Sequence, residues 1–192
     1  MSEKLADIQY NFINLPSRIE FENGHVISYL YDADGIKLRT THIIGSDTTV
    51  TDYCGNVIYE NGIPVKLLTE AGYVTLADSK YHYFVQDHLG NNRVVVDQSG
   101  NVEEVNHYYP FGGLLSSSVS NAVQPYKYNG KELDRKNGLD WYDYGARMYD
   151  AALGRWHAVD PLSEKYYNWS LYVYCLNNSI RNRSYRYGSE RL

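Results

Sequence analysis

The sequence predicts a mainly β protein in which antiparallel hairpins stack into a curved sheet. Tyrosine contributes 21 of the 192 residues, against 4 phenylalanines and 3 tryptophans, and aromatic rings with a polar tip suit a half-buried pleated surface. Turn sequences recur, often about ten residues apart, from Asn23-Gly24 to Asn137-Gly138. Apolar and polar residues alternate between these turns, which is typical of strands with one buried face.

Length, charge and cysteine content restrict the class of protein. A chain of 192 residues suits one domain or two small ones. Its 18 basic and 23 acidic residues give a net charge of -5, which argues against a nucleic-acid or anionic-membrane partner. No apolar run approaches the roughly 20 residues of a membrane span, and residues 1–9 lack an export-signal pattern. Cys54 and Cys175 are too few for a disulfide framework and lack zinc-ligand spacing.

The clearest hairpin is predicted over residues 29–39. Tyr29 and Tyr31 alternate before the turn at residues 32–35, Asp-Ala-Asp-Gly, and apolar residues alternate after it. We expect Gly35 to supply the positive φ that a tight turn needs, and the Asp32 side chain to hydrogen-bond its own turn backbone. Tyr10-Asn11 precedes Tyr31-Asp32 by 21 residues, which indicates a second repeat of the same unit.

The same turn chemistry continues along the chain. Residues 87–90 and 97–100 each begin with aspartate, end with glycine and follow a strand-like run, and Asn61-Gly62 and Asn129-Gly130 are further hairpin signals. Each hairpin has one apolar face, so neighbouring hairpins must stack, and a fragment leaves an open strand edge. The serine-rich residues 114–121 are predicted to form a loop.

A short helix is predicted over residues 160–177. Asp160 suits the N-cap and Pro161 the first helical position. Asn177-Asn178 can end the helix. The apolar positions at helical spacing are Leu162, Tyr166, Trp169, Val173 and Leu176.

Several segments between residues 81 and 178 form a specific ordered set. They are residues 86–93 (QDHLGNNR), 107–112 (HYYPFG), 128–134 (YNGKELD), 138–150 (GLDWYDYGARMYD), 153–156 (LGRW), 160–161 (DP) and 177–178 (NN). Together they resemble the Rhs repeat-associated core domain of the type common in Bacteroidetes, and residues 31–35 resemble a YD repeat. We therefore divide the chain into YD-repeat-like hairpins (1–80), a core domain (81–178) and a divergent basic tail (179–192).

The resemblance implies a fold and a role. YD-repeat proteins form long β-sheets that spiral into a hollow shell, and the core domain plugs one end. A variable C-terminal toxin follows, which the shell holds unfolded. The implied partners are an upstream YD-repeat shell and that toxin, with no cofactor or metal. The parent protein is expected to be secreted or at the cell surface, whereas this chain, without a signal peptide, is cytoplasmic unless a dedicated system exports it.

The chain departs from the family pattern at both ends. Only two clear YD-like units precede the core, and no aspartate follows Asp160. In many family members the core cuts the toxin free with paired aspartates in Asp-Pro motifs, so Asp160 is a vestigial catalytic candidate whose partner is missing. We favour the N-cap interpretation of Asp160. The sequence is interpreted as a truncated or orphan cassette without a toxin, whose end a frameshift has altered.

The predicted function is therefore non-catalytic, as the structural plug of a partial shell. Turn glycines, including Gly100 and Gly145, permit the backbone path, and Trp141, Trp156 and Trp169 anchor the plug. The residues assigned structural roles are Tyr31, Asp32, Gly35, Asp87, Gly90, Arg93, Tyr109, Pro110, Gly112, Gly130, Trp141, Tyr142, Arg147, Tyr149, Asp150, Gly154, Arg155, Trp156 and Pro161.

Several alternatives stay open beside this interpretation. A self-cleaving aspartic core needs a second acid. A surface module that binds glycans or a neighbouring cell needs an exposed aromatic row, for which the tyrosine pairs 81/83, 126/128 and 142/144 are candidates, although cross-strand packing is favoured. We favour a turn role for His88 over a metal ligand. We favour packing roles for the two cysteines over nucleophilic ones. The arginine-rich tail is more typical of a frayed end than of a nucleic-acid contact.

Overall fold

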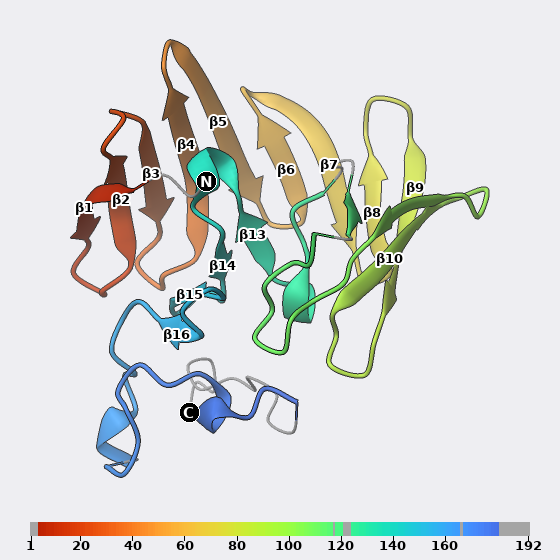
Figure 1. The fold of residues 1–192 in the computed structure, drawn as a ribbon. Coiled ribbons are helices and arrows are strands. Elements are labelled where there is room, and N and C mark those ends of the chain that lie inside the picture. Colours follow the sequence, from red (N-terminus) through yellow and green to blue (C-terminus); the bar gives the residue numbers. More distant parts are fainter. Residues whose placement is uncertain (1–3, 117, 121–123, 166, 181–192) are drawn as a thin grey trace.

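The computed structural model describes residues 4–116, 118–120, 124–165 and 167–180 (Figure 1). Within these residues, twelve strands form one antiparallel sheet in which every strand pairs with its neighbours in sequence. We call this sheet the wall. Its strands are β1 (Leu5–Tyr10), β2 (Pro16–Phe21), β3 (Val26–Tyr31), β4 (Lys37–Ile44), β5 (Asp47–Cys54), β6 (Val57–Glu60), β7 (Ile63–Thr69), β8 (Gly72–Thr75), β9 (Lys80–Gln86), β10 (Asn92–Asp97), β11 (Val102–Val105) and β12 (Val119–Ser120).

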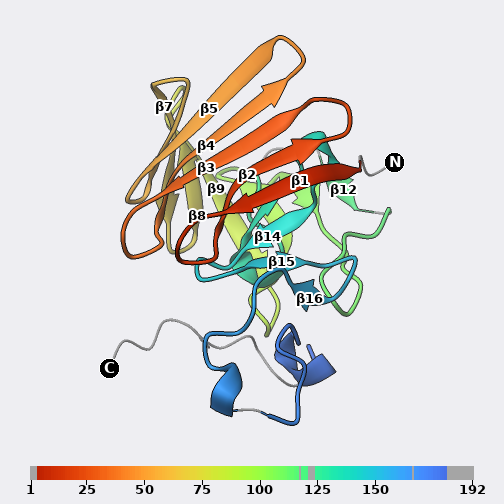
Figure 2. The ribbon, with the colours of Figure 1, turned by 90° about the vertical axis from the view of Figure 1, so that its left-hand side faces the viewer.

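A second antiparallel sheet of four strands follows, which we call the inner sheet. Its strands are β13 (Glu132–Asp134), β14 (Trp141–Asp143), β15 (Met148–Asp150) and β16 (Arg155–Trp156). Figures 1 and 2 show the wall curving around the inner sheet, which lies against one face of it. The predicted fold, mainly β with antiparallel hairpins in a curved sheet, is confirmed.

One five-residue turn is used four times in the wall. The first backbone N–H donates to the fifth carbonyl at 2.9–3.1 Å, and the fourth N–H donates to the first carbonyl at 2.9–3.2 Å. The first side-chain oxygen accepts hydrogen bonds from the third and fifth N–H groups at 2.8–3.1 Å. The turns are residues 11–15, 32–36, 87–91 and 97–101.

These turns confirm the prediction for Asp32 and Gly35. Asp32 accepts from two backbone N–H groups of its own turn, and Gly35 has a φ of 81°. The 21-residue repeat also holds in space, because Asn11 takes the role of Asp32 and Asn14, with a φ of 60°, takes that of Gly35. Asparagine tolerates this left-handed conformation better than other non-glycine residues.

The α-helix predicted over residues 160–177 is wrong. The described part of this segment contains only two short 3-10 turns, η3 (Ser163–Lys165) and η4 (Cys175–Asn177); Tyr166 lies outside the described residues. The backbone instead runs alongside residues 155–160: Trp156 N–H donates to Tyr172 O at 3.1 Å and Asp160 N–H to Leu171 O at 2.9 Å. These partners replace those of a helix.

Two smaller expectations also need correction. The serine-rich residues 114–121 are not loop throughout, because Val119–Ser120 form β12 against β11 and Leu114 bridges to Tyr108. Trp169, expected to anchor the plug, is 45% exposed, whereas Trp141 is 3% exposed. Helical spacing placed Trp169 on a buried face that does not exist. None of the helical turns among the described residues is long and apolar enough to cross a membrane.

Candidate functional site: the junction of the wall and the inner sheet

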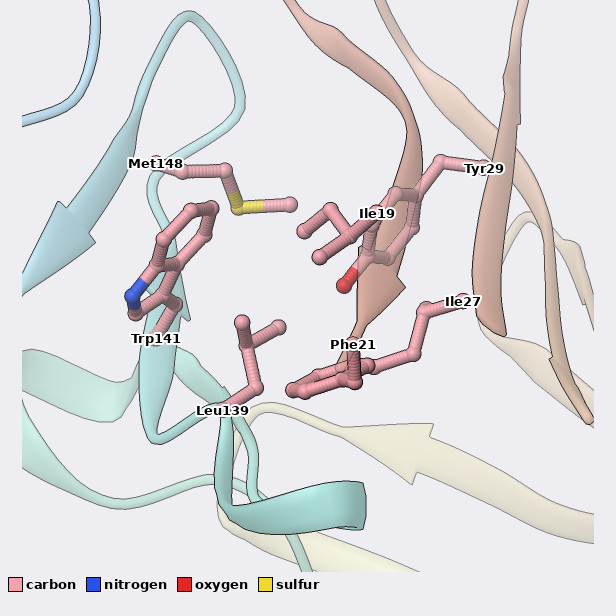
Figure 3. Close-up of a cluster of buried hydrophobic side chains, with 7 residues drawn as sticks. All are labelled: Ile19, Phe21, Ile27, Tyr29, Leu139, Trp141 and Met148. Atoms are coloured by element: carbon pink, nitrogen blue, oxygen red, sulfur yellow. The ribbon is translucent and has the colours of Figure 1, made fainter. Parts of the chain in front are cut away.

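An apolar cluster joins the first strands of the wall to the inner sheet (Figure 3). Ile19 and Phe21 on β2 and Ile27 and Tyr29 on β3 face residues of the inner sheet and of the turn between β13 and β14. Those residues are Leu139, Trp141 and Met148, and all seven are buried. Side chains from two distant parts of the sequence, residues 19–29 and 139–148, therefore share one core that joins the two sheets.

A half-buried ionic group also joins the wall to the inner sheet. Lys37 Nζ on β4 lies 2.7 Å from Glu132 Oε2 on β13 and 2.7 Å from Asp143 Oδ2 on β14. Tyr53 on β5 donates its hydroxyl to Glu132 Oε1 at 2.7 Å. Burial lowers the pKa of Lys37, but the two carboxylates outweigh it and hold that pKa well above its ordinary value. One wall cation thus pairs with two inner-sheet anions.

A second polar group crosses the same junction. His42 Nε2 on β4 lies 3.0 Å from Asp134 Oδ2 on β13, and Tyr29 donates its hydroxyl to the same oxygen at 2.9 Å. Burial raises the pKa of Asp134, but the hydrogen bonds from His42 and Tyr29 outweigh it, so the pKa lies below its ordinary value. Glu132 and Asp134 flank Leu133 and share one face of β13, as expected of a strand.

Tyrosine hydroxyls from the inner sheet and η1 (Tyr128–Gly130) hold the loop at residues 110–112. Tyr128 donates to Pro110 O at 3.1 Å, Tyr149 to Phe111 O at 2.8 Å, and Tyr142 to Gly112 O at 2.9 Å. Three successive backbone carbonyls are therefore satisfied by side chains rather than by a strand. A Cβ at residue 112 would lie 2.5 Å from Tyr128 Cδ1, so only glycine fits there.

Asn129 connects three parts of the chain. Its backbone N–H donates to Asn91 Oδ1 at 2.8 Å, and its Nδ2 donates to Leu89 O at 3.0 Å. Its Oδ1 accepts from the hydroxyls of Tyr144 at 2.7 Å and Tyr174 at 2.8 Å. The turn before β10, the end of β14 and the C-terminal segment therefore meet at the side chain of Asn129. The Asn129 backbone has a φ of 50°.

Asp87 and Arg93, two of the residues predicted to be structural, form an ion pair in the structure. Asp87 Oδ2 accepts from Arg93 Nε at 2.8 Å and from Asn91 Nδ2 at 2.9 Å. Burial raises the pKa of Asp87, but these bonds outweigh it and the pKa is lowered. Gly90 has a φ of 78° and Gly130 a φ of 67°, as the turn geometry requires.

Both carboxylate oxygens of Asp160 contact neighbouring groups of the protein. Its Oδ1 accepts from Leu162 N–H at 2.8 Å and caps a turn rather than an α-helix. Its Oδ2 lies 3.0 Å from Arg147 Nη1, and that buried guanidinium lies 4.2 Å from the ring centre of Trp156. Pro161 follows at the exposed start of the turn.

The remaining predicted residues divide into buried and exposed positions. Trp156, Tyr142 and Tyr149 belong to a second buried cluster, and Tyr31 packs against the first. Asp150 accepts from the backbone N–H groups of the turn after β15. Gly154 has a φ of 64°. Tyr109 and Arg155 are exposed, although Arg155 pairs through its backbone with Asp150 and Val173.

The residues considered for chemistry are dispersed. Among the residues that the structure describes, no three histidine, cysteine, aspartate or glutamate side chains are grouped to hold a metal ion. His82 stacks on Tyr73 with 4.3 Å between ring centres. Cys54 is exposed, and burial raises the pKa of Cys175 to about 11. Most of the basic tail, residues 181–192, lies outside the described residues.

The three tyrosine pairs differ in burial. Tyr128 and Tyr142 are buried, and Tyr126 and Tyr144 are half-buried, so these pairs pack inside the molecule. Tyr81 and Tyr83 on β9 are 50% and 42% exposed. The sequence did not predict that Lys37, His42, Glu132 and Asp134 form a junction. The one local signal was the alternation Glu-Leu-Asp on β13, which marks a strand with a charged face but no partner.

The chain is similar to proteins of one family. The teneurin YD-shell family model matches residues 67–190. Salivary gland surface protein 1 of Aedes aegypti is 29% identical over 190 residues, covering 85% of this chain and 6% of that protein. Toxin subunit YenC1 of Yersinia entomophaga is 30% identical over 128 residues, covering 58% of this chain and 13% of that protein. This chain thus spans a small part of each relative.

Solved structures show the same fold. A crystal structure of a TcdB2–TccC3 complex matches with a TM-score of 0.75 and 18% identity, over 91% of this chain and 10% of that chain. The Photorhabdus luminescens Tc holotoxin pore matches with a TM-score of 0.73 and 20% identity, over 91% of this chain and 10% of that chain. At such identities the likeness concerns the fold. Because the family model covers well over half of the sequence, this chain belongs to the teneurin YD-shell family.

Proposed function

We propose that this chain is a structural part of a β-walled shell, at the place where the wall meets a plug that closes it. The observation that carries the proposal is the junction, in which one apolar cluster and two largely buried polar groups join β2–β5 to β13–β15. Ion pairs removed from water add little net stability, but in some proteins they fix the register of the elements that they join. Such a junction suits a wall that must keep its plug in one orientation.

A non-catalytic role fits the use of the polar side chains. Lys37 pairs with Glu132 and His42 with Asp134 across the junction. Asp160 pairs with Arg147. Each of these groups already has a structural partner. We therefore propose enclosure, with no turnover, as the function of this part of the molecule.

The wider context is proposed for the parent protein. It would be an Rhs-type YD-repeat protein of the kind common in Bacteroidetes, with upstream wall repeats, a C-terminal toxin as partner, and a secreted or cell-surface location. Relatives named as toxin subunits and as a surface protein support this. The division at residues 80 and 178 belongs to the same proposal, although the wall itself continues through β9 to β12.

A chimera tests the enclosing role. Residues 4–180 would replace the structurally equivalent stretch of the TcdB2–TccC3 complex, and limited proteolysis would follow the polypeptide that comes after the exchanged stretch. We expect that polypeptide to stay protected from protease. A folded chimera that exposes it at once would refute the proposal.

Two matched variants test whether the junction is needed to protect that polypeptide from protease. Lys37→Ala removes the cation shared by Glu132 and Asp143, so we expect faster cleavage. Arg135→Ala removes one exposed ion pair with Asp140 and serves as the control. Equal cleavage of both variants would show that the junction does not hold the shell closed.

The wider context is tested in the DNA around this reading frame. We expect upstream YD repeats, a toxin reading frame and an adjacent immunity gene. Their absence would contradict the proposal.

One observation favours a second function. Tyr81 and Tyr83 form an exposed pair on β9, and exposed aromatic rows are binding surfaces in some proteins. We propose glycan binding at this pair as the alternative. A glycan array should then show binding that Tyr81→Ser/Tyr83→Ser removes, whereas an array without signals would leave only the structural role.

A further inference from the structure

A buried polar cluster lies away from the junction, between β11 and the segment that leads into η1. Glu104 is 0% exposed, Asn106 is 1% exposed and Lys127 is 2% exposed. Glu104 Oε1 accepts from Lys127 Nζ at 2.5 Å, from Gln124 Nε2 at 3.0 Å, and from Asn106 Nδ2. An amine, two carboxamides and a carboxyl group therefore meet at one oxygen atom, out of contact with water.

The amine is held in a state that favours reaction. Burial lowers the pKa of Lys127, although Glu104 opposes this shift. A lysine with a lowered pKa is more often the neutral amine, and only the neutral amine is a nucleophile. A buried ion pair whose charges can cancel by proton transfer avoids the desolvation penalty of two ions.

Unpaired acceptors surround the same carboxyl group. Glu104 Oε2, Asn106 Oδ1 and Gln124 Oε1 are buried and have no hydrogen-bond partner in the described structure. Buried polar atoms without partners are rare. A protonated carboxyl group would supply an O–H donor for an amide oxygen. The three unpaired oxygens therefore suit a neutral carboxylic acid beside a neutral amine.

We propose that Lys127 and Asn106 become joined by an intramolecular amide bond, with Glu104 as the catalytic acid–base. The Lys127 ammonium passes one proton to Glu104, and Nζ attacks Asn106 Cγ. A bond from Nζ to Cγ forms, and the bond from Cγ to Nδ2 breaks. Overall, the lysine ammonium and the asparagine amide become a secondary amide and an ammonium ion, and Glu104 is regenerated. No oxidant, metal or cofactor is needed.

The geometry assigns Asn106 rather than Gln124 as the amide that reacts. Two atoms that each hydrogen-bond the same oxygen lie within about 6 Å of each other, so Lys127 Nζ is close to both carboxamides. Asn106 Nδ2 also donates to Asn92 O at 3.1 Å, which fixes the orientation of this group. A fixed electrophile reduces the entropy lost on reaching the transition state.

The bond would close the chain between residues 106 and 127 into a covalent loop. That loop contains residues 110–112, whose carbonyls bind the inner tyrosines. It would attach β11 of the wall directly to the segment before the inner sheet. A permanent link at this place suits a shell whose plug must not separate from its wall.

Mass spectrometry of the purified full chain tests the proposal. Loss of one ammonia should lower the intact mass by about 17 Da. Residues 94–127 contain no other lysine or arginine, so Asn106 and Lys127 lie in one tryptic peptide. Because trypsin does not cleave after an acylated lysine, peptide mapping should show residues 94–131 as one peptide that has lost ammonia, and fragmentation should place the link between Asn106 and Lys127. An unmodified mass, or an ammonia loss mapped elsewhere such as the Asn129-Gly130 pair, would overturn the proposal.

Variants separate the three roles. Lys127→Met and Glu104→Gln should each abolish the mass loss, as should Asn106→Leu, and circular dichroism would show whether each variant folds. Gln124→Leu and Lys66→Arg should keep the mass loss, since they change the neighbouring amide and a second half-buried amine. If Gln124→Leu loses the link and Asn106→Leu keeps it, then Gln124 and not Asn106 is the amide that reacts, and the proposal is wrong. The wild-type peptide map stays decisive even if a variant does not fold.

Discussion

At the scale of single residues, glycine is required where a backbone conformation and a close contact coincide. Gly112 has a φ of 87°, and its position is closed by the Tyr128 ring. Gly100 has a nearly equal φ of 84°, but a Cβ there would meet no atom within 4 Å. A side chain at residue 100 would therefore meet conformational strain alone, whereas one at residue 112 would meet strain and steric overlap together.

Gly112→Ala should lower the free energy of unfolding by about 2–5 kcal/mol, because strain and overpacking add. Gly100→Ala, the control, should cost about 1–2 kcal/mol from strain alone. Urea denaturation of both variants measures the difference. Equal losses would mean that the Tyr128 ring moves aside without penalty.

Burial decides the value of each tryptophan. Trp141 lies in the apolar cluster at 3% exposure, so Trp141→Ala should cost roughly 3–5 kcal/mol. Trp169→Ala, at an exposed position, should change stability by only about 0.5 kcal/mol. Thermal unfolding of the two variants compares them, and a larger loss for Trp169 would place that residue in a core.

At the scale of elements, β13 and β4 depend on carboxylates that act as anions. The pKa of Asp134 is lowered in the folded protein, and so are those of Asp87 and Asp150. A lowered folded-state pKa contributes stability that is fully present above the unfolded-state pKa. That contribution is lost as the pH falls through the folded-state value.

The free energy of unfolding should therefore fall as the pH drops below about 4, the ordinary pKa of aspartate. Asp134→Asn should weaken this dependence, because the group at the junction no longer titrates. Urea midpoints measured from about pH 6 to about pH 2 give both slopes. A wild-type midpoint that does not change over this range would contradict the role of the carboxylates.

The elements also show which local patterns can be predicted. The turn at residues 32–36 followed from Asp32 and Gly35, because five adjacent residues contain the whole hydrogen-bond pattern. The helix over 160–177 failed because apolar spacing alone does not say whether a backbone finds partners in a helix or beside residues 155–160. Spacing is a weak indicator where tertiary contacts compete.

At the scale of the whole molecule, the wall has an open edge at β1. Among the described strands, β1 pairs only with β2, and five of its six residues are exposed. Free N–H and C=O groups on an exposed edge bind further strands.

The isolated chain should therefore self-associate as its concentration rises. Ala6→Lys places a charge on the exposed edge and should reduce association. Ser99→Lys, at an exposed turn far from β1 in sequence, adds the same charge and is the control. Sedimentation velocity compares the three proteins, and equal association of both variants would exclude the edge as the contact.

The residues in sequence order were enough to predict the antiparallel β class, the turns and the division of apolar and polar faces. These depend on alternation and on contacts within about five residues, which short-range chemistry specifies. Only the tertiary structure shows that Lys37 meets Glu132, that His42 meets Asp134, and that Lys127 and Asn106 meet at Glu104. Such pairs form because two curved sheets bring distant residues together, and their selection depends on the burial that the complete fold creates.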